Sequence, residues 1–291
     1  MRINFSKWHG YGNDFVLVSS TGLEDTDPGE FALRVCSPHF GFGADGCVII
    51  KKIAESDFEL RIFNQDGSEA GMSGNGCRCA AAQIHRSGLR ASSSVFLHAS
   101  GGKKTFQLIS QSDNRTWHYR SEIGEPRFEP EAVPCLAEGE GPVSQFPLDV
   151  GDEIIRVNAL SLGNPQCAIM VDKLPDEETF ERLGNGLERH GFFPQRTNVS
   201  FVNVIDRQRL SIRIWERGVG PTLSSGTGSS GAAVTAIRLG LVNSPVTVET
   251  FTGEQLVSWQ PGDPVVLEGM ACLTAEGSFY WDGASPCPST I

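Results

Sequence analysis

Short apolar runs, separated by turns rich in glycine, asparagine and aspartate, predict a chain built mainly from strands. In the first half, Phe58–Phe63 alternates apolar and polar residues, as a half-exposed strand does. Two helices are predicted there, a short one over Glu30–Cys36 and one from about Gly74 to Ser87, which Gly88 ends. The other expected strands are Phe15–Val18, Cys47–Ile50, Val95–His98, Thr105–Ile109 and Thr116–Tyr119.

The same pattern restarts in the second half. Residues 124–145, rich in Pro, Glu and Gly, are the best linker candidate before it. A helix over Phe180–His190 and a glycine-led helix ending at Gly240 are predicted. Strands over Ala271–Trp281 exceed what this half needs, so we expect them to return to the first half. The remaining expected strands are Ile154–Ala159, Cys167–Val171, Asn198–Val204, Leu210–Trp215, Val246–Thr250, Gln255–Trp259 and Pro264–Gly269.

An internal duplication explains the repeated pattern. Ser73-Gly74-Asn75-Gly76 and Ser225-Gly226-Thr227-Gly228 each open a predicted helix, 152 positions apart. The match continues on both sides at the same offset, without gaps, over about 29 residues. The matching pairs include Arg61-Ile62-Phe63 with Arg213-Ile214-Trp215, and Ala80-Ala81 with Ala232-Ala233.

These elements predict an α+β fold of two pseudo-symmetric domains. Each would be a curled, mostly antiparallel sheet or barrel around a central helix, whose small residues let strands pack closely around it. The expected boundaries are 1–123 plus 271–291 for the N-terminal domain and 124–270 for the C-terminal domain. We expect the active cleft to lie where the two helix N-termini meet.

Composition and charge exclude several classes of partner. The 291 residues carry a net charge of −11 without a long run of one sign, which argues against nucleic acid or an anionic membrane as the main partner. The N-terminus lacks the apolar run of a signal peptide, and no stretch approaches the roughly 20 apolar residues of a membrane span. We therefore expect a cytoplasmic protein. The oligomeric state stays open, with a homodimer as one candidate.

The spacing of the cysteines indicates no metal site. The eight positions are Cys36, Cys47, Cys77, Cys79, Cys135, Cys167, Cys272 and Cys287. They contain no paired C-x-x-C spacing, so a zinc site is not expected. Buried structural cysteine is the expectation for all eight.

The two glycine stretches predict anion sites. A helix N-terminus exposes unpaired N–H groups and a positive dipole end, and glycines let an anion approach closely. Neither copy carries the lysine of a P-loop, and the glycine spacing does not fit a dinucleotide fingerprint. A carboxylate held between two helix ends fits better, because the same N–H groups stabilise charge that develops when the adjacent carbon is deprotonated.

Six blocks together resemble the diaminopimelate epimerase family, in the family's order and across most of the chain. They are His9–Phe15, Gly41–Gly46, Arg61–Glu69, Gly163–Pro165, Glu216–Gly218 and Ser225–Gly228. The resemblance implies a PLP-independent amino-acid epimerase with no cofactor and no metal, acting on a small-molecule substrate in the lysine and peptidoglycan precursor pathway. It most directly implies interconversion of LL- and meso-diaminopimelate.

The resemblance also assigns roles to residues. Gly74, Asn75, Gly226 and Thr227 would hold the carboxylate at the reacting carbon. The distal amino-acid end would be held by Asn13, Asn64, Asn164, Asn198, Glu216 and Arg217, with Arg217 taking a carboxylate bidentately. For each asparagine alone, a turn or capping role is the commoner one.

This sequence departs from the family pattern at the catalytic positions. The family has two cysteines that exchange the Cα proton, and Ser73 and Ser225 stand in their places, with Glu216 retained as a catalytic candidate. A serine hydroxyl is a much poorer base than a thiol unless another base activates it. Gln166 replaces the usual histidine after Asn164-Pro165. Gly46 stands where several members have glutamine.

Three hypotheses fit the serines. They are a Cys-to-Ser inactivated epimerase, a natural relative with isomerisation or elimination chemistry based on Glu216, or an amino-acid binder without turnover. A serine hydrolase is a rival from another class. It lacks a G-x-S-x-G elbow and a histidine in a motif context beside either serine.

Overall fold

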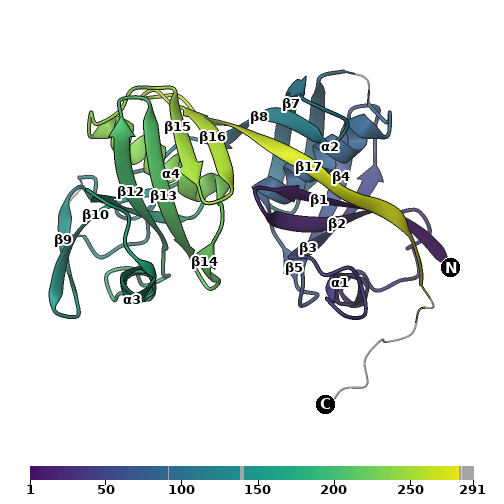
Figure 1. The fold of residues 1–291 in the computed structure, drawn as a ribbon, viewed down its shortest axis with the longest axis horizontal. Coiled ribbons are helices and arrows are strands. Elements are labelled where there is room, and N and C mark those ends of the chain that lie inside the picture. Colours follow the sequence, from purple (N-terminus) through teal and green to yellow (C-terminus); the bar gives the residue numbers. More distant parts are fainter. Residues whose placement is uncertain (91, 138–140, 282, 284–291) are drawn as a thin grey trace, which may run out of the picture. The chain divides into compact units, whose positions relative to one another are not determined.

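Two glycine-led helices, α2 (Gly74–Arg86) and α4 (Gly226–Arg238), organise the fold. The structure is a computed structural model that describes residues 1–90, 92–137, 141–281 and 283. Each helix packs its buried face against strands of a curled sheet (Figure 1). The α+β class with a central helix in each sheet, predicted above, is confirmed.

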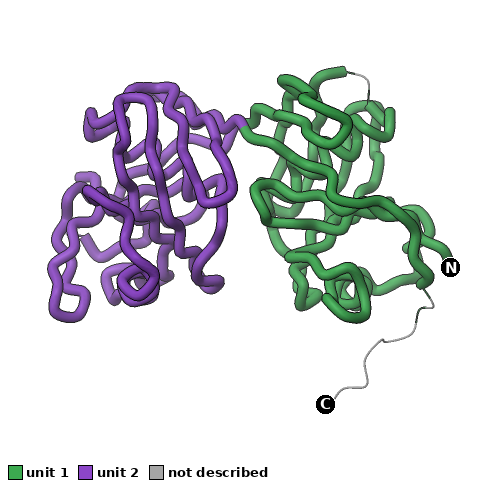
Figure 2. The backbone as a smooth tube through the Cα atoms, in the orientation of Figure 1, with its two compact units in different colours: residues 1–121, 269–291 green, residues 122–268 purple. Residues whose placement is uncertain are grey.

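The chain forms two compact units (Figure 2). The first contains Met1–Ser121 and Gly269–Ile291, and the second contains Glu122–Glu268. The chain passes between them within two strands, β8 (Thr116–Gly124) and β17 (Val265–Tyr280).

The first unit closes its sheet into a barrel. Its strand pairings run from β1 through β2, β3, β4, β6, β7, β8 and β17 and back to β1, with β2–β3 and β4–β6 parallel. The bounds are β1 (Arg2–Gly10), β2 (Asn13–Ser19), α1 (Pro28–Cys36), β3 (Gly46–Lys52), β4 (Asp57–Asn64), β5 (Glu69–Ala70), β6 (Ser94–Ala99) and β7 (Gly102–Gln111).

The second unit repeats this order. Its sheet runs β10, β11, β12, β13, β15, β16 and the start of β17, with β11–β12 and β13–β15 parallel. The bounds are β9 (Phe146–Val150), β10 (Glu153–Ser161), β11 (Pro165–Val171), α3 (Glu177–Glu188), β12 (Asn198–Asp206), β13 (Arg209–Glu216), β14 (Gly220–Thr222), β15 (Val246–Thr250) and β16 (Gly253–Ser258). The starts of β11, β12, β13, α4 and β15 lie 152 residues after those of β2, β3, β4, α2 and β6. The duplication therefore extends from sequence to topology.

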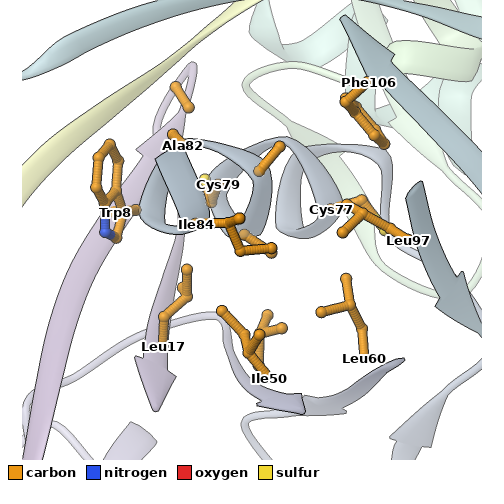
Figure 3. Packing of buried hydrophobic residues seen from close by; sticks show 14 of the residues in the cluster. Trp8, Leu17, Ile50, Leu60, Cys77, Cys79, Ala82, Ile84, Leu97 and Phe106 are labelled. Atoms are coloured by element: carbon orange, nitrogen blue, oxygen red, sulfur yellow. The ribbon is translucent and has the colours of Figure 1, made fainter. Parts of the chain in front are cut away.

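Small side chains on α2 let the barrel close around it. Ala80, Ala81, Ala82 and Ile84 are fully buried and belong to one core cluster with residues of the surrounding strands (Figure 3). The surrounding strands supply Trp8, Leu17, Ile50, Leu60, Leu97 and Phe106. Because interiors are close-packed, larger residues along this helix would push the strands apart.

Two expectations from the sequence need correction, and one strand was not predicted. Residues 124–145 are not a free linker, because Val133 and Val143 are buried in the core of the second unit. The strands predicted as Pro264–Gly269 and Ala271–Trp281 are one continuous strand, β17. The sequence pattern also missed β1, whose alternation is broken by a register shift between Lys7 and Trp8.

Helix α3 lies against strand β13 through a close glycine contact. A Cβ on Gly184 would lie 2.7 Å from the Trp215 ring. We expect Gly184→Ala to lower the free energy of unfolding by about 1–3 kcal/mol, because the clash exceeds the gain of roughly 1 kcal/mol in helix propensity. Urea denaturation measures it, with Gly191→Ala, where no atom lies within 4 Å, as control. An unchanged unfolding midpoint for Gly184→Ala would contradict this packing.

Candidate active site

Ser73 and Ser225 are the N-caps of the two central helices. Both have extended backbones, with φ/ψ of −136°/117° and −142°/127°. Ser73 Oγ accepts a hydrogen bond from Gly76 N at 3.1 Å, and Ser225 Oγ accepts one from Gly228 N at 3.3 Å. The first two N–H groups of each helix have no partner within the helix, so they are available to an anion.

The hydrogen bond from Gly76 N to Ser73 Oγ should contribute to the stability of the fold. We expect Ser73→Ala to lower the free energy of unfolding by about 1 kcal/mol, because the Gly76 N–H loses its acceptor. Exposed Ser93 supplies the control, and Ser93→Ala should leave stability unchanged. Chemical denaturation of both variants measures the difference, and equal stability would show that the cap contributes nothing.

In the first unit, an asparagine relay joins β2 to the start of α2. Asn75 Nδ2 donates to Asn13 Oδ1 at 3.3 Å, and Asn13 Nδ2 donates to Asp45 Oδ2 at 2.8 Å. Arg78 Nη1 donates to Asn75 Oδ1 at 2.8 Å. Asn75 is buried, so its orientation is fixed by these contacts.

Arg78 is an unusual residue in this relay. Its side chain is 1% exposed, its Nε has no hydrogen-bond partner among the described residues, and no ion pair to it occurs there. Burial lowers the pKa of its guanidinium. A buried positive charge near the α2 N-terminus adds to the helix dipole and favours an anion there.

Asn64 lies at the same end of the sheet as Asn13. It ends β4, directly opposite Gly46 at the start of β3, and Gly46 in turn pairs with Phe15 of β2. Its Nδ2 donates to Ser68 Oγ at 2.9 Å, and its side chain is exposed. Asn13, Asn64, Ser73 and Asn75 thus line one edge of the first unit.

The second unit carries the matching contact. Asn164 Nδ2 donates to Thr227 Oγ1 at 3.4 Å, as Asn13 meets Asn75 in the first unit. Gln166 Nε2 donates to Asn164 Oδ1 at 2.9 Å. Gln166 is 2% exposed, and its Oε1 has no partner among the described residues. Gln166 therefore orients Asn164 and does not titrate.

Glu216 ends β13 beside Ser225. Hydrogen bonding from the nearby Ser225 side chain lowers the pKa of Glu216. Burial has the larger, opposite effect, so the pKa of Glu216 lies above its ordinary value. The position equivalent to Glu216 in the first unit is Asn64, so only the second unit places a carboxylate at this point.

Arg217 and Asn198 lie next to Glu216. Asn198 is buried at the start of β12, and its Oδ1 accepts a hydrogen bond from Arg217 N at 3.0 Å. The exposed Arg217 side chain donates from Nη1 to Gln195 O at 3.1 Å. Strands β11 and β12 start, and β13 ends, at this edge, which explains how residues far apart in sequence meet.

The cysteines do not replace the missing thiols. Cys36, Cys47, Cys77, Cys79 and Cys167 are buried, Cys135 and Cys272 are partly buried, and Cys287 lies outside the described residues. Burial raises the pKa of Cys77, one turn beyond Ser73, to about 12. A thiol with that pKa is protonated at neutral pH and is a poor base.

Neither serine has a histidine partner of the kind a hydrolase needs. Among the described residues, Ser73 and Ser225 make no hydrogen bond to histidine, and His9 Nδ1 accepts instead from Gly12 N at 3.2 Å. Across the ranges that the structure describes, no cluster of three or more His, Cys, Asp and Glu side chains is placed to hold a metal ion. No described helix has the length and apolar character to cross a bilayer.

Comparison with known proteins decides the family. The sequence profile of diaminopimelate epimerase matches residues 5–129 and 158–273. The chain belongs to the diaminopimelate epimerase family. A diaminopimelate epimerase from Desulforudis audaxviator is 40% identical over 281 residues, covering 95% of this chain and 99% of that protein. One from Pelotomaculum thermopropionicum is 37% identical over 283 residues, covering 95% and 99%.

Solved structures show the same fold at low sequence identity. A hydroxyproline epimerase from Agrobacterium vitis matches with a TM-score of 0.65 at 12% identity, covering 95% of this chain and 92% of that one. A methylitaconate-delta-isomerase matches with a TM-score of 0.66 at 12% identity, covering 100% and 98%. The profile match and the full-length relatives confirm the family resemblance drawn from the sequence motifs.

Sequence reasoning missed three residues that orient the candidate site residues at the sheet edges of the two units. Asp45 and Arg78 orient Asn13 and Asn75, and Glu188 binds the turn after Glu216. Glu188 had a usable signal, because a carboxylate in the last turn of a predicted helix opposes the helix dipole. Arg78 carried no comparable signal in one sequence.

Proposed function

We propose that this chain is a PLP-independent isomerase that interconverts LL- and meso-diaminopimelate by exchanging the proton at one α-carbon. The observation that supports this most is the pair of serine-capped, glycine-led helix starts, one in each unit of an epimerase-family chain. Each start lies beside an asparagine that contacts its second residue. Two equivalent half-sites suit a carbon that is approached from two faces.

Substrate binding would use both helix starts. The N–H groups at Gly74, Asn75, Gly226 and Thr227 would bind the carboxylate on the reacting carbon. They would also stabilise the negative charge that develops there when the proton leaves. We assign the distal end of the substrate to Asn13, Asn64, Asn164, Asn198, Glu216 and Arg217. Arg217 pairs with a carboxylate, and the oxygens of the others accept from an ammonium.

Proton transfer would be unequal on the two faces. On the Ser225 side, Ser225 Oγ takes the α-proton while its own proton passes to Glu216. In the reverse direction, Ser225 returns a proton to the α-carbon and regains its own from Glu216. On the Ser73 side, the described residues place no carboxylate on the hydroxyl, which bonds only Gly76 N. The proton exchange at Ser73 therefore limits the rate of inversion.

Incubation with LL-diaminopimelate in D₂O tests this function. We expect deuterium to enter the α-position very slowly, and meso product to form more slowly still. L-Lysine, which lacks the distal carboxylate, should not exchange, because Arg217 then has no partner. Rapid deuterium uptake would contradict the claim that serine limits the rate, and equal uptake by lysine would contradict the distal assignment.

One observation favours a second candidate function. Among the described residues, a carboxylate lies beside the serine of the second unit but not beside the serine of the first, so a single base could remove a proton and return it to another atom of the same substrate. That would be isomerisation or elimination without inversion. It predicts product formation from a substrate with an activated C–H bond while the α-carbon of diaminopimelate stays unchanged.

A further inference from the structure

Glu188 is a buried carboxylate that contacts both sides of the Glu216-Arg217 pair. It ends helix α3, and its side chain is 3% exposed. Its Oε1 accepts a hydrogen bond from Gly218 N at 2.9 Å, and its Oε2 accepts one from Trp215 Nε1 at 3.1 Å. Residues 215 and 218 directly flank the pair.

The position is unfavourable for a carboxylate unless its partners compensate. A negative charge at a helix C-terminus opposes the dipole, and burial removes water from the charge. Arg189 Nε lies 3.7 Å from one carboxylate oxygen and Arg196 Nη1 lies 3.5 Å from the other. The two hydrogen bonds and these cations outweigh burial, so the pKa of Glu188 lies below its ordinary value. Glu188 is therefore ionised at neutral pH.

Glu188 and Asn198 together hold the tip of the turn after β13. Val219 N donates to Glu216 O at 3.1 Å, which closes a turn with Arg217 and Gly218 at its centre. Asn198 Oδ1 accepts from Arg217 N, and Glu188 Oε1 accepts from Gly218 N. Both N–H groups at the tip are thus bound by side chains of the same unit. A turn whose tip is fixed on both sides presents its side chains in one orientation.

We propose that Glu188 is a positioning residue, which fixes Glu216 and Arg217 for substrate by bonding the residues on either side of them. This rests on the proposed function of Arg217 in binding the distal carboxylate. Arg196 supports the arrangement, because it reaches Glu188 from a left-handed backbone conformation with φ of 59°, which is unfavourable for arginine.

Glu188→Gln tests the proposal with little change in size. Its amide cannot accept both hydrogen bonds equally well, because one end of it donates. We expect binding of meso-diaminopimelate to weaken about tenfold by isothermal titration calorimetry, with the thermal midpoint changed by only a few degrees. Amide hydrogen exchange of residues 216–218 should become about tenfold faster, while exchange in α4 stays unchanged.

A matched control comes from the same helix. Glu177 also ion-pairs with β13, through Arg213 at 2.6 Å, but it is exposed. Glu177→Gln should leave binding and exchange at 216–218 unchanged. An equal effect of both substitutions would assign the change to the contact between α3 and β13 as a whole and would overturn the proposal.

A double substitution separates positioning from general support. In an Arg217→Ala background, Glu188→Gln should cause a much smaller further loss of affinity than in the unaltered chain, because only Glu216 is then left for it to position. Additive losses, or native affinity and native exchange in Glu188→Gln, would overturn the proposal. If the unaltered chain binds no diaminopimelate, the proposed function fails, and exchange at 216–218 alone then decides whether Glu188 holds the turn.

Discussion

Replacing both Ser73 and Ser225 by cysteine should raise the rate of α-proton exchange on LL-diaminopimelate by about 10³-fold or more, within the range that one general acid–base group contributes. The reason is acidity. A free cysteine thiol has a pKa near 8.5, and a helix N-terminus lowers it, whereas a serine hydroxyl stays protonated. Both serines already occupy the N-cap position with matching backbone angles. Deuterium incorporation and conversion to the meso isomer measure the gain.

Single and misplaced cysteines are the controls. Ser73→Cys or Ser225→Cys alone should leave inversion slow, because one face still lacks an acid. Ser229→Cys, fully buried one turn further along α4, should have no effect. No gain from the double replacement would show that the site does not perform epimerase chemistry, and would favour the isomerase or the binder.

Glu216→Gln should abolish most of the residual exchange that the unaltered chain shows on the Ser225 side, by about 10²-fold or more. Glutamine keeps the shape and can still accept the Ser225 hydroxyl, but it cannot take the proton. In the unaltered chain, the rate of α-proton exchange should rise with pH through the pKa of Glu216, because only the carboxylate acts as a base. Burial raises that pKa, so the inflection should lie above the ordinary value for glutamate.

Glu216→Gln should lower activity but raise the free energy of unfolding. Because the folded pKa of Glu216 is raised, the folded state favours the protonated form. Ionisation therefore costs stability as the pH rises through the raised pKa, and this loss is absent below the unfolded value of about 4.3. Glu216→Gln should be more stable than the unaltered chain at neutral pH and equal to it in acid. Denaturation across pH checks this, and a variant less stable at neutral pH would contradict the burial argument.

The sequence predicted the central helices well because their signals are local. Ser73 and Ser225 cap them, and Gly88 and Gly240, with φ of 70° and 69°, follow their ends. The offset of 152 also predicted that the halves would share topology, because side-chain patterns that pack alike fold alike.

The features that sequence missed depend on contacts between distant residues. Val133 and Val143 lie in a segment whose proline and glycine content is typical of a linker, yet both are buried in the core of the second unit. Strand β1 was hidden by its register shift. The relay through Asp45 and Arg78 joins residues on three elements, so no local pattern signals it.

A crystal structure of the chain with diaminopimelate tests the central claim most directly. The slow turnover that we propose for serine predicts that the substrate remains intact during soaking. We predict one carboxylate within hydrogen-bond distance of the N–H groups that begin both α2 and α4, and the distal carboxylate on the Arg217 guanidinium. A ligand bound at only one helix start, or with neither carboxylate at a helix start, would contradict the account.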